Sequence, residues 1–217
     1  MLDTPDQPTL APEPARNPIA VLRQFARARP PAERCELCAA PLSPEHQHLL
    51  DPAARQLLCA CDACAVLFSA GQGMKYRRVP RRIESWPGLV MSNDQWDALG
   101  IPIGLAFFFR NSAGQTFSVY PSPAGATEVL LAQDVWQMLV ADNPALEKLE
   151  ADVEALLVNR IRGARQYFRL PIDECYKLVG LIRTHWRGLS GGKEMWEQIT
   201  EFFQSLEARS VKVRTHA

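Results

Sequence analysis

Five of the six cysteines lie between positions 35 and 64, and their spacing predicts a metal site. Cys35 and Cys38 form one Cys-x2-Cys pair, and Cys61 and Cys64 form a second pair after 22 intervening residues. Each pair turns the backbone so that both sulfurs face one ion, and four thiolates complete a tetrahedron around it. We therefore predict a structural zinc site on these four cysteines, with no open position for catalysis.

Neighbouring residues leave alternatives for the ligand set. Cys59 lies two residues before Cys61, so on a strand both thiols would face the same side and Cys59 could replace it. His46 and His48 lie between the two pairs and are further candidate ligands. The alternatives without metal are a buried thiol for Cys59 and a hydrogen-bonded structural imidazole for His48. Iron of the rubredoxin type is the alternative metal, because it also accepts four thiolates.

The remaining chain must supply the elements that position this site. We expect a flexible tail over 1–18, a short helix and linker over 19–31, a zinc-knuckle module over 32–74, a mixed α+β domain over 75–209 and a second tail over 210–217. The apolar runs 104–110 and 115–120 flank Asn-Ser-Ala-Gly and predict a β-hairpin. Four segments with apolar residues at helical spacing follow: 135–140, 144–157, 172–186 and 195–206. The predicted fold class is α+β: a small zinc-ribbon or treble-clef module, then a mixed domain with a helix-rich C-terminal half.

A glycine-rich turn precedes the last predicted helix. Residues 188–192 match G-x-S-x-G, but a helical pattern enters the turn where a nucleophile elbow needs a strand, so we expect no hydrolase and assign no catalytic residue. The free amides at the start of the helix attract anions, and nearby cations add charge. The candidate anion-binding residues are Arg187, Ser190, Gly191, Gly192 and Lys193. The alternative is a close-packed turn in which Ser190 caps the helix.

Two segments are candidate partner surfaces. The first is the basic run Lys75, Arg77, Arg78, Arg81 and Arg82. It contains one aromatic residue, Tyr76, so a solvated strand face is the alternative and nucleic-acid binding is not expected. The second is the proline-rich loop 120–128, for which the alternative is a strand-to-helix connection capped by Thr127.

Composition excludes several classes of protein. The 24 Lys and Arg residues balance 24 Asp and Glu residues, and 22% of the chain is charged, which argues against a disordered chain or a histone-like coat. The longest apolar run, 99–109, contains a proline and two glycines and is too short to cross a membrane. Since the N-terminus resembles no secretory signal, we expect a cytoplasmic protein.

The stretch CELCAAPLSPEHQHLLDPAARQLLCACDACAVLF resembles the treble-clef module of HNH endonucleases. The resemblance implies that the four paired cysteines bind zinc and that His46 or His48 falls near the catalytic histidine. The chain departs from the family because Glu45 or Gln47, rather than Asp, precedes the histidine. A nuclease also needs a second metal held by histidine and oxygen ligands, and the sequence offers no such set.

A second resemblance covers residues 35–205. The motifs CELC, HLLD, CAC-x2-C, WDALGIPIGLAFFF, YPSPAGATE, DVEALLVNR and HWRGLSGG are similar to those of an uncharacterised bacterial family whose genes often lie beside uptake [NiFe]-hydrogenase genes. The resemblance implies a hydrogenase subunit or maturation factor as partner. We therefore expect a zinc-stapled accessory protein that is not an enzyme. The alternatives are a treble-clef nucleic-acid-binding protein or nuclease and an iron-thiolate electron-transfer or metal-handling protein.

Overall fold

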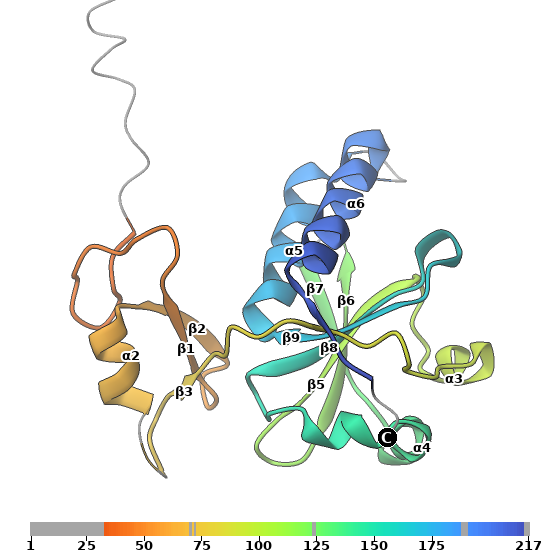
Figure 1. Ribbon diagram of the computed structural model, residues 1–217, viewed down its shortest axis with the longest axis horizontal. Coiled ribbons are helices and arrows are strands. Elements are labelled where there is room, and N and C mark those ends of the chain that lie inside the picture. Colours follow the sequence, from red (N-terminus) through yellow and green to blue (C-terminus); the bar gives the residue numbers. More distant parts are fainter. Residues whose placement is uncertain (1–32, 70, 72, 123–124, 188–190, 215–217) are drawn as a thin grey trace, which may run out of the picture.

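The computed structural model describes residues 33–214 except 70, 72, 123–124 and 188–190. The predicted tail over 1–18, the predicted helix over 19–31 and Ser190 therefore lie outside the described residues. Two β-sheets with associated helices make up the described chain, which confirms the α+β class (Figure 1).

The smaller sheet belongs to the cysteine-containing module. Its strand order is β2 (Gln56–Ala60), β1 (Gln47–Asp51) and β3 (Arg77–Arg78), and all neighbours are antiparallel. Helix α2 (Asp62–Ser69) follows β2 directly. Strand β3 lies in the basic run that we assigned to the mixed domain, but it pairs with β1. The module therefore continues beyond residue 74.

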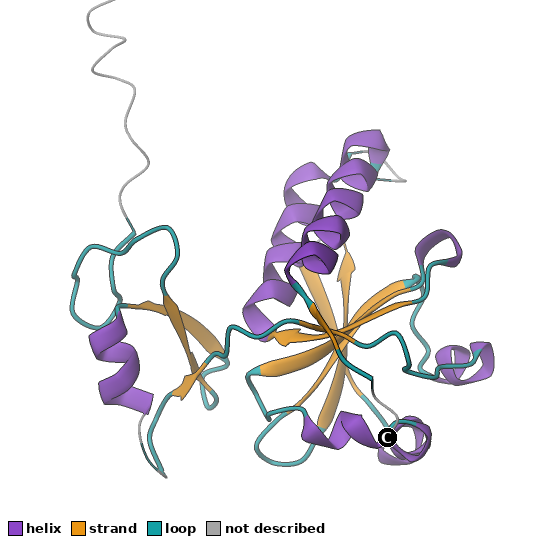
Figure 2. Cartoon of the chain, viewed as in Figure 1, coloured by secondary structure: helices purple, strands orange, loops and turns teal. Residues whose placement is uncertain are grey.

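The larger sheet has seven strands and forms the centre of the mixed domain (Figure 2). In spatial order the strands are β10 (Val211–Lys212), β4 (Glu84–Ser85), β9 (Gln166–Pro171), β8 (Glu154–Asn159), β5 (Leu105–Arg110), β6 (Thr116–Ser122) and β7 (Gly125–Leu130). All neighbours are antiparallel except β10 and β4, which are parallel. Strand β10 lies in the segment expected to be a tail.

Helices cover both faces of this sheet, and side chains on both faces of its strands are therefore buried. On β5, Phe107 and Phe109 join the core beneath α5 (Ile172–His185) and α6 (Gly192–Arg209). The alternate residues Ala106 and Phe108 join the opposite core, with side chains from α3 (Asn93–Ala98), α4 (Gln133–Asp142) and the 3-10 helix η1 (Pro144–Lys148). A second 3-10 turn, η2 (Ile161–Gly163), connects β8 to β9.

The structure confirms the predicted hairpin (β5–β6) and the helices α4, α5 and α6. The predicted helix over 144–157 is wrong, because only η1 is helical, residues 149–153 form a bend and a turn, and β8 begins at Glu154. All six residues of β8 are buried, so its apolar residues do not alternate and resemble a helical stripe. The loop predicted over 120–128 is also wrong where it is described, since Gly125–Leu130 forms β7 and Thr127 pairs with Tyr120.

The side chain of Asn143, between α4 and η1, joins the end of α4 to the loop between β4 and α3. It is fully buried, accepts a hydrogen bond from the amide of Val90 at 2.7 Å, and donates to the carbonyls of Val90 and Leu139. We expect Asn143→Ala to lower the free energy of unfolding by about 2 kcal/mol or more, because it leaves buried backbone groups unpaired. Urea denaturation would measure this loss, and an unchanged midpoint would contradict it.

Candidate metal centre

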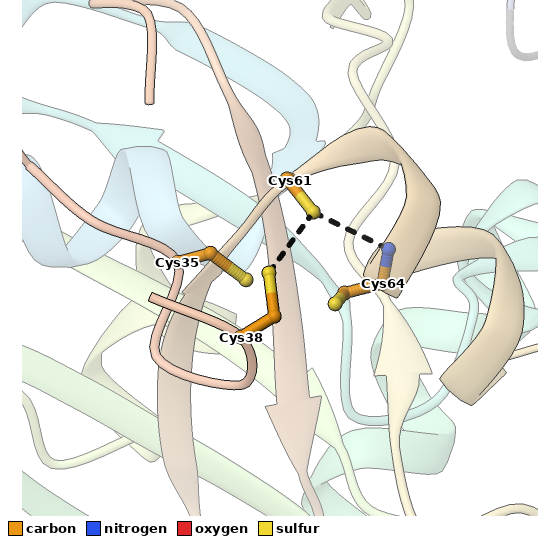
Figure 3. Close-up of side chains that lie close together, drawn as sticks. All are labelled: Cys35, Cys38, Cys61 and Cys64. Atoms are coloured by element: carbon orange, nitrogen blue, oxygen red, sulfur yellow. Dashed lines mark hydrogen bonds between the residues drawn. The ribbon is translucent and has the colours of Figure 1, made fainter. Parts of the chain in front are cut away.

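The four paired cysteines converge at one point of the module. Their four Sγ atoms all lie within 4.8 Å of one another, and those of Cys38 and Cys61 are 3.7 Å apart (Figure 3). A tetrahedron with metal–sulfur distances of about 2.3 Å has sulfur–sulfur edges of about 3.8 Å. The spacing of the sulfurs therefore fits one tetrahedral metal ion.

The first Cys-x2-Cys pair is a tight turn stabilised by its own backbone. Ala39 donates its amide to the carbonyl of Cys35 at 2.7 Å, and Cys35 donates to the carbonyl of Ala40 at 2.8 Å. To close the turn, Ala39 adopts a φ of 60°, a left-handed conformation that costs about 1 kcal/mol for a residue with a Cβ. Glu36 joins this turn to β2 through two hydrogen bonds with the backbone of Cys59.

The second pair begins helix α2. The amide of Cys64 points at the sulfur of Cys61 at 3.5 Å (Figure 3). Ala65 donates to the carbonyl of Cys61 at 2.8 Å. Gln47 on β1 donates to the Asp62 carboxylate in the first helical turn, which fixes the start of α2 against the sheet. Cys61, just before α2, and Cys64, in its first turn, therefore place two of the four sulfurs at the start of this helix.

The environment shifts the pKa values of the thiols in opposite directions. Burial opposes ionisation of Cys35, but hydrogen bonds from the backbone of Cys61, Leu37 and Cys38 outweigh it and lower its pKa to about 6. Burial and the neighbouring thiols raise the pKa of Cys64 to about 12. A metal ion must displace the remaining thiol protons as it binds, so affinity for the metal should increase with pH.

The other predicted ligands form a separate cluster. Cys59 lies opposite His48 in the β1–β2 pairing, and its sulfur groups with the rings of His46 and His48 rather than with the four cysteines. The sequence indicated no partner for these histidines in the C-terminal half. In the structure His48 has such a partner: it is hydrogen-bonded to Asp173, at the start of α5 and 125 residues further along the chain.

Most of the basic run is paired within the chain. Lys75 pairs with Asp51, Arg77 with Asp152, and Arg82 with Glu154, while Arg78 donates to Gln47. Arg81 lines a cleft beside the histidines.

The candidate anion site is described only in part. Gly191 and Gly192 have φ values of 86° and 77° at the start of α6. Arg187 donates to the carbonyls of Thr184 and Trp186 at the end of α5, and Lys193 pairs with Glu197. Each of the two cations therefore has a partner among the described residues.

The fold and the site define a class of protein: a small cysteine-rich module, with four thiols arranged for one metal ion, joined to an α+β domain with a seven-stranded sheet. Residues 34–210 match a family of unknown function, DUF5947, and the chain belongs to this family. No curated protein and no solved structure matches the chain significantly. None of the helices in the described part combines the length and apolar character of a membrane span.

Proposed function

We propose that the protein is a zinc-stapled accessory protein that binds another protein through helix α2. The observation that carries this proposal is the exposure of consecutive large apolar side chains on one short helix. Val66, Leu67 and Phe68 are 56%, 67% and 40% exposed, and Met74 just beyond the helix is 39% exposed. We call these four residues the α2 surface. Large apolar groups gathered on an exposed surface are typical of protein-binding sites.

The metal and the α2 surface belong to one small structure. The core of the module contains few buried apolar residues, namely Cys35, Leu49, Ala60, Cys64 and Ala65. Such a core provides little folding energy, so a bound ion would provide much of it. Zinc suits this role because it is redox-inert and favours a closed tetrahedron of thiolates. Through Cys61 and Cys64 it would also hold α2 in place.

The resemblance to a hydrogenase-associated family makes a hydrogenase subunit or maturation factor the first partner to test. We also propose a cytoplasmic location, because free thiols persist in a reducing compartment. The α2 surface favours an apolar groove on the partner.

A charge placed on the α2 surface tests the proposal. We expect Leu67→Glu to weaken binding to purified [NiFe]-hydrogenase subunits or maturation proteins at least tenfold, because the new carboxylate would be buried in the interface without a partner charge. Met138→Glu is the matched control, because Met138 is 47% exposed on helix α4 of the other domain. Isothermal titration calorimetry would measure both affinities.

Equal affinities for Leu67→Glu and Met138→Glu would contradict the assigned surface. Binding to none of these proteins would reject the hydrogenase partner. Metal-dependent cleavage of DNA or RNA by the pure protein would favour the nuclease alternative, and an iron-thiolate absorption spectrum would favour electron transfer.

A further inference from the structure

His46, His48 and Cys59 converge on a cleft between the module and the start of α5. Their ligand atoms lie within 4.8 Å of one another, and the rings of the two histidines are 4.8 Å apart, edge to face. All three residues line the cleft, which has a volume of about 460 Å³ and includes Arg81 and Lys177 in its wall. This cluster is distinct from the four cysteines, which share no member with it.

His46 has a buried ring nitrogen without a hydrogen-bond partner among the described residues. Its Nδ1 lies 3.0 Å from the carbonyl oxygen of Ser43, so Nδ1 carries the proton and donates it. Its Nε2 then holds a lone pair, but that atom is buried and has no hydrogen-bond partner among the described residues. The side chain is only 7% exposed. A buried imidazole nitrogen without a partner is costly unless something occupies its lone pair.

His48 is oriented in the same way by a carboxylate. Its Nδ1 lies 2.7 Å from Oδ2 of Asp173, which favours the proton on Nδ1 and leaves the Nε2 lone pair free. A carboxylate that accepts a hydrogen bond from the ring nitrogen that does not bind the metal is the usual support of a metal-binding histidine. The β1–β2 register places Cys59 directly opposite His48, so both side chains emerge on one face of the hairpin.

We propose that His46 Nε2, His48 Nε2 and the Cys59 thiolate bind a second metal ion, a late first-row divalent ion such as Zn²⁺. The Cys59 thiol releases its proton to solvent as the sulfur–metal bond forms. Two imidazoles and one thiolate leave a fourth position, which faces the cleft. Three protein ligands with an open position are typical of exchangeable or catalytic sites, whereas the site of the four paired cysteines is closed. Asp173 acts as a positioning residue through His48.

This inference goes beyond the proposed function and does not depend on it. Titration of the metal-free full chain with Zn²⁺ alone should show two equivalents, one of which a chelator removes easily. Cys59→Ser should lose the second equivalent and keep the first. Asp173→Asn should weaken the second site 10- to 100-fold without changing the first. His185→Ala is the matched control, because His185 pairs with Glu194 outside both clusters and should leave both equivalents intact.

Co²⁺ distinguishes the two sites by spectrum. Replacing thiolates by imidazoles strengthens the ligand field, so the d–d bands of the second equivalent should lie at shorter wavelength than those of the first. A single equivalent in the wild type, or a second one that survives Cys59→Ser, would overturn the proposal. If Cys59→Ser does not fold, Asp173→Asn decides: unchanged affinity for the second equivalent overturns the proposal.

Discussion

Replacing Cys61 or Cys64 with Ser should release the metal of the four-cysteine site and unfold the module while the seven-stranded sheet persists. Structural zinc contributes about 10–16 kcal/mol of binding free energy in small domains at neutral pH. The five buried residues of the module core cannot replace that contribution. The larger domain has its own cores on both faces of its sheet and should remain folded.

Elemental analysis combined with amide hydrogen exchange would measure this outcome. Amides of β1, β2 and α2 should lose protection in either variant, while those of β5, β8 and β9 keep it. Cys175→Ala is the control, because Cys175 lies on the fully buried face of α5, outside the four-cysteine cluster. It should retain the metal, although it lowers the free energy of unfolding by about 1 kcal/mol. Full protection of β1 after chelation would show that the module folds without the ion.

Local patterns in the sequence were sufficient to predict the elements whose formation depends mainly on residues close together in the chain. The two Cys-x2-Cys pairs predicted which sulfurs gather, because each pair needs only a tight turn. Helices α5 and α6 were predicted because each buries one stripe and exposes the rest. The β5–β6 hairpin was predicted because its turn is short and its strands are contiguous.

Features that depend on contacts between distant segments could not be predicted. Strand β8 is buried on both faces because it lies at the centre of the sheet, and no local pattern reports that position. Asp173 is one of 24 acidic residues, and only the fold brings it to His48. The sequence offers Cys59 as an alternative ligand, but its partner across the hairpin depends on the β1–β2 register.

Glu154 should be among the most sensitive positions outside the cysteine and histidine clusters. Its side chain is fully buried at the start of β8, and its carboxylate bonds to Arg82 and Arg169, each at 2.6 Å. Arg169 is itself only 9% exposed. We expect Glu154→Gln to lower the free energy of unfolding by about 3–5 kcal/mol, because a neutral amide replaces the nearest carboxylate of the buried Arg169 and leaves only the more distant Glu84, at 3.7 Å, to balance its charge. Glu150→Gln is the matched control: Glu150 is 55% exposed and lies 3.8 Å from Arg82, so its loss should cost under about 1 kcal/mol.

The pH dependence gives Glu154 a signature that loss of packing alone would not produce. Burial opposes its ionisation, but Arg82, Arg169 and the amide of Glu150 outweigh burial and hold its pKa below the ordinary value of 4.5. A carboxyl with a lowered pKa stabilises the fold above its unfolded pKa, and this stabilisation disappears as the pH falls through the folded pKa. The difference in unfolding free energy between wild type and Glu154→Gln should therefore be constant near neutral pH and shrink below pH 4.5. Denaturation series at several pH values would measure it, and a difference that stays constant in acid would show that the ion pairs contribute nothing.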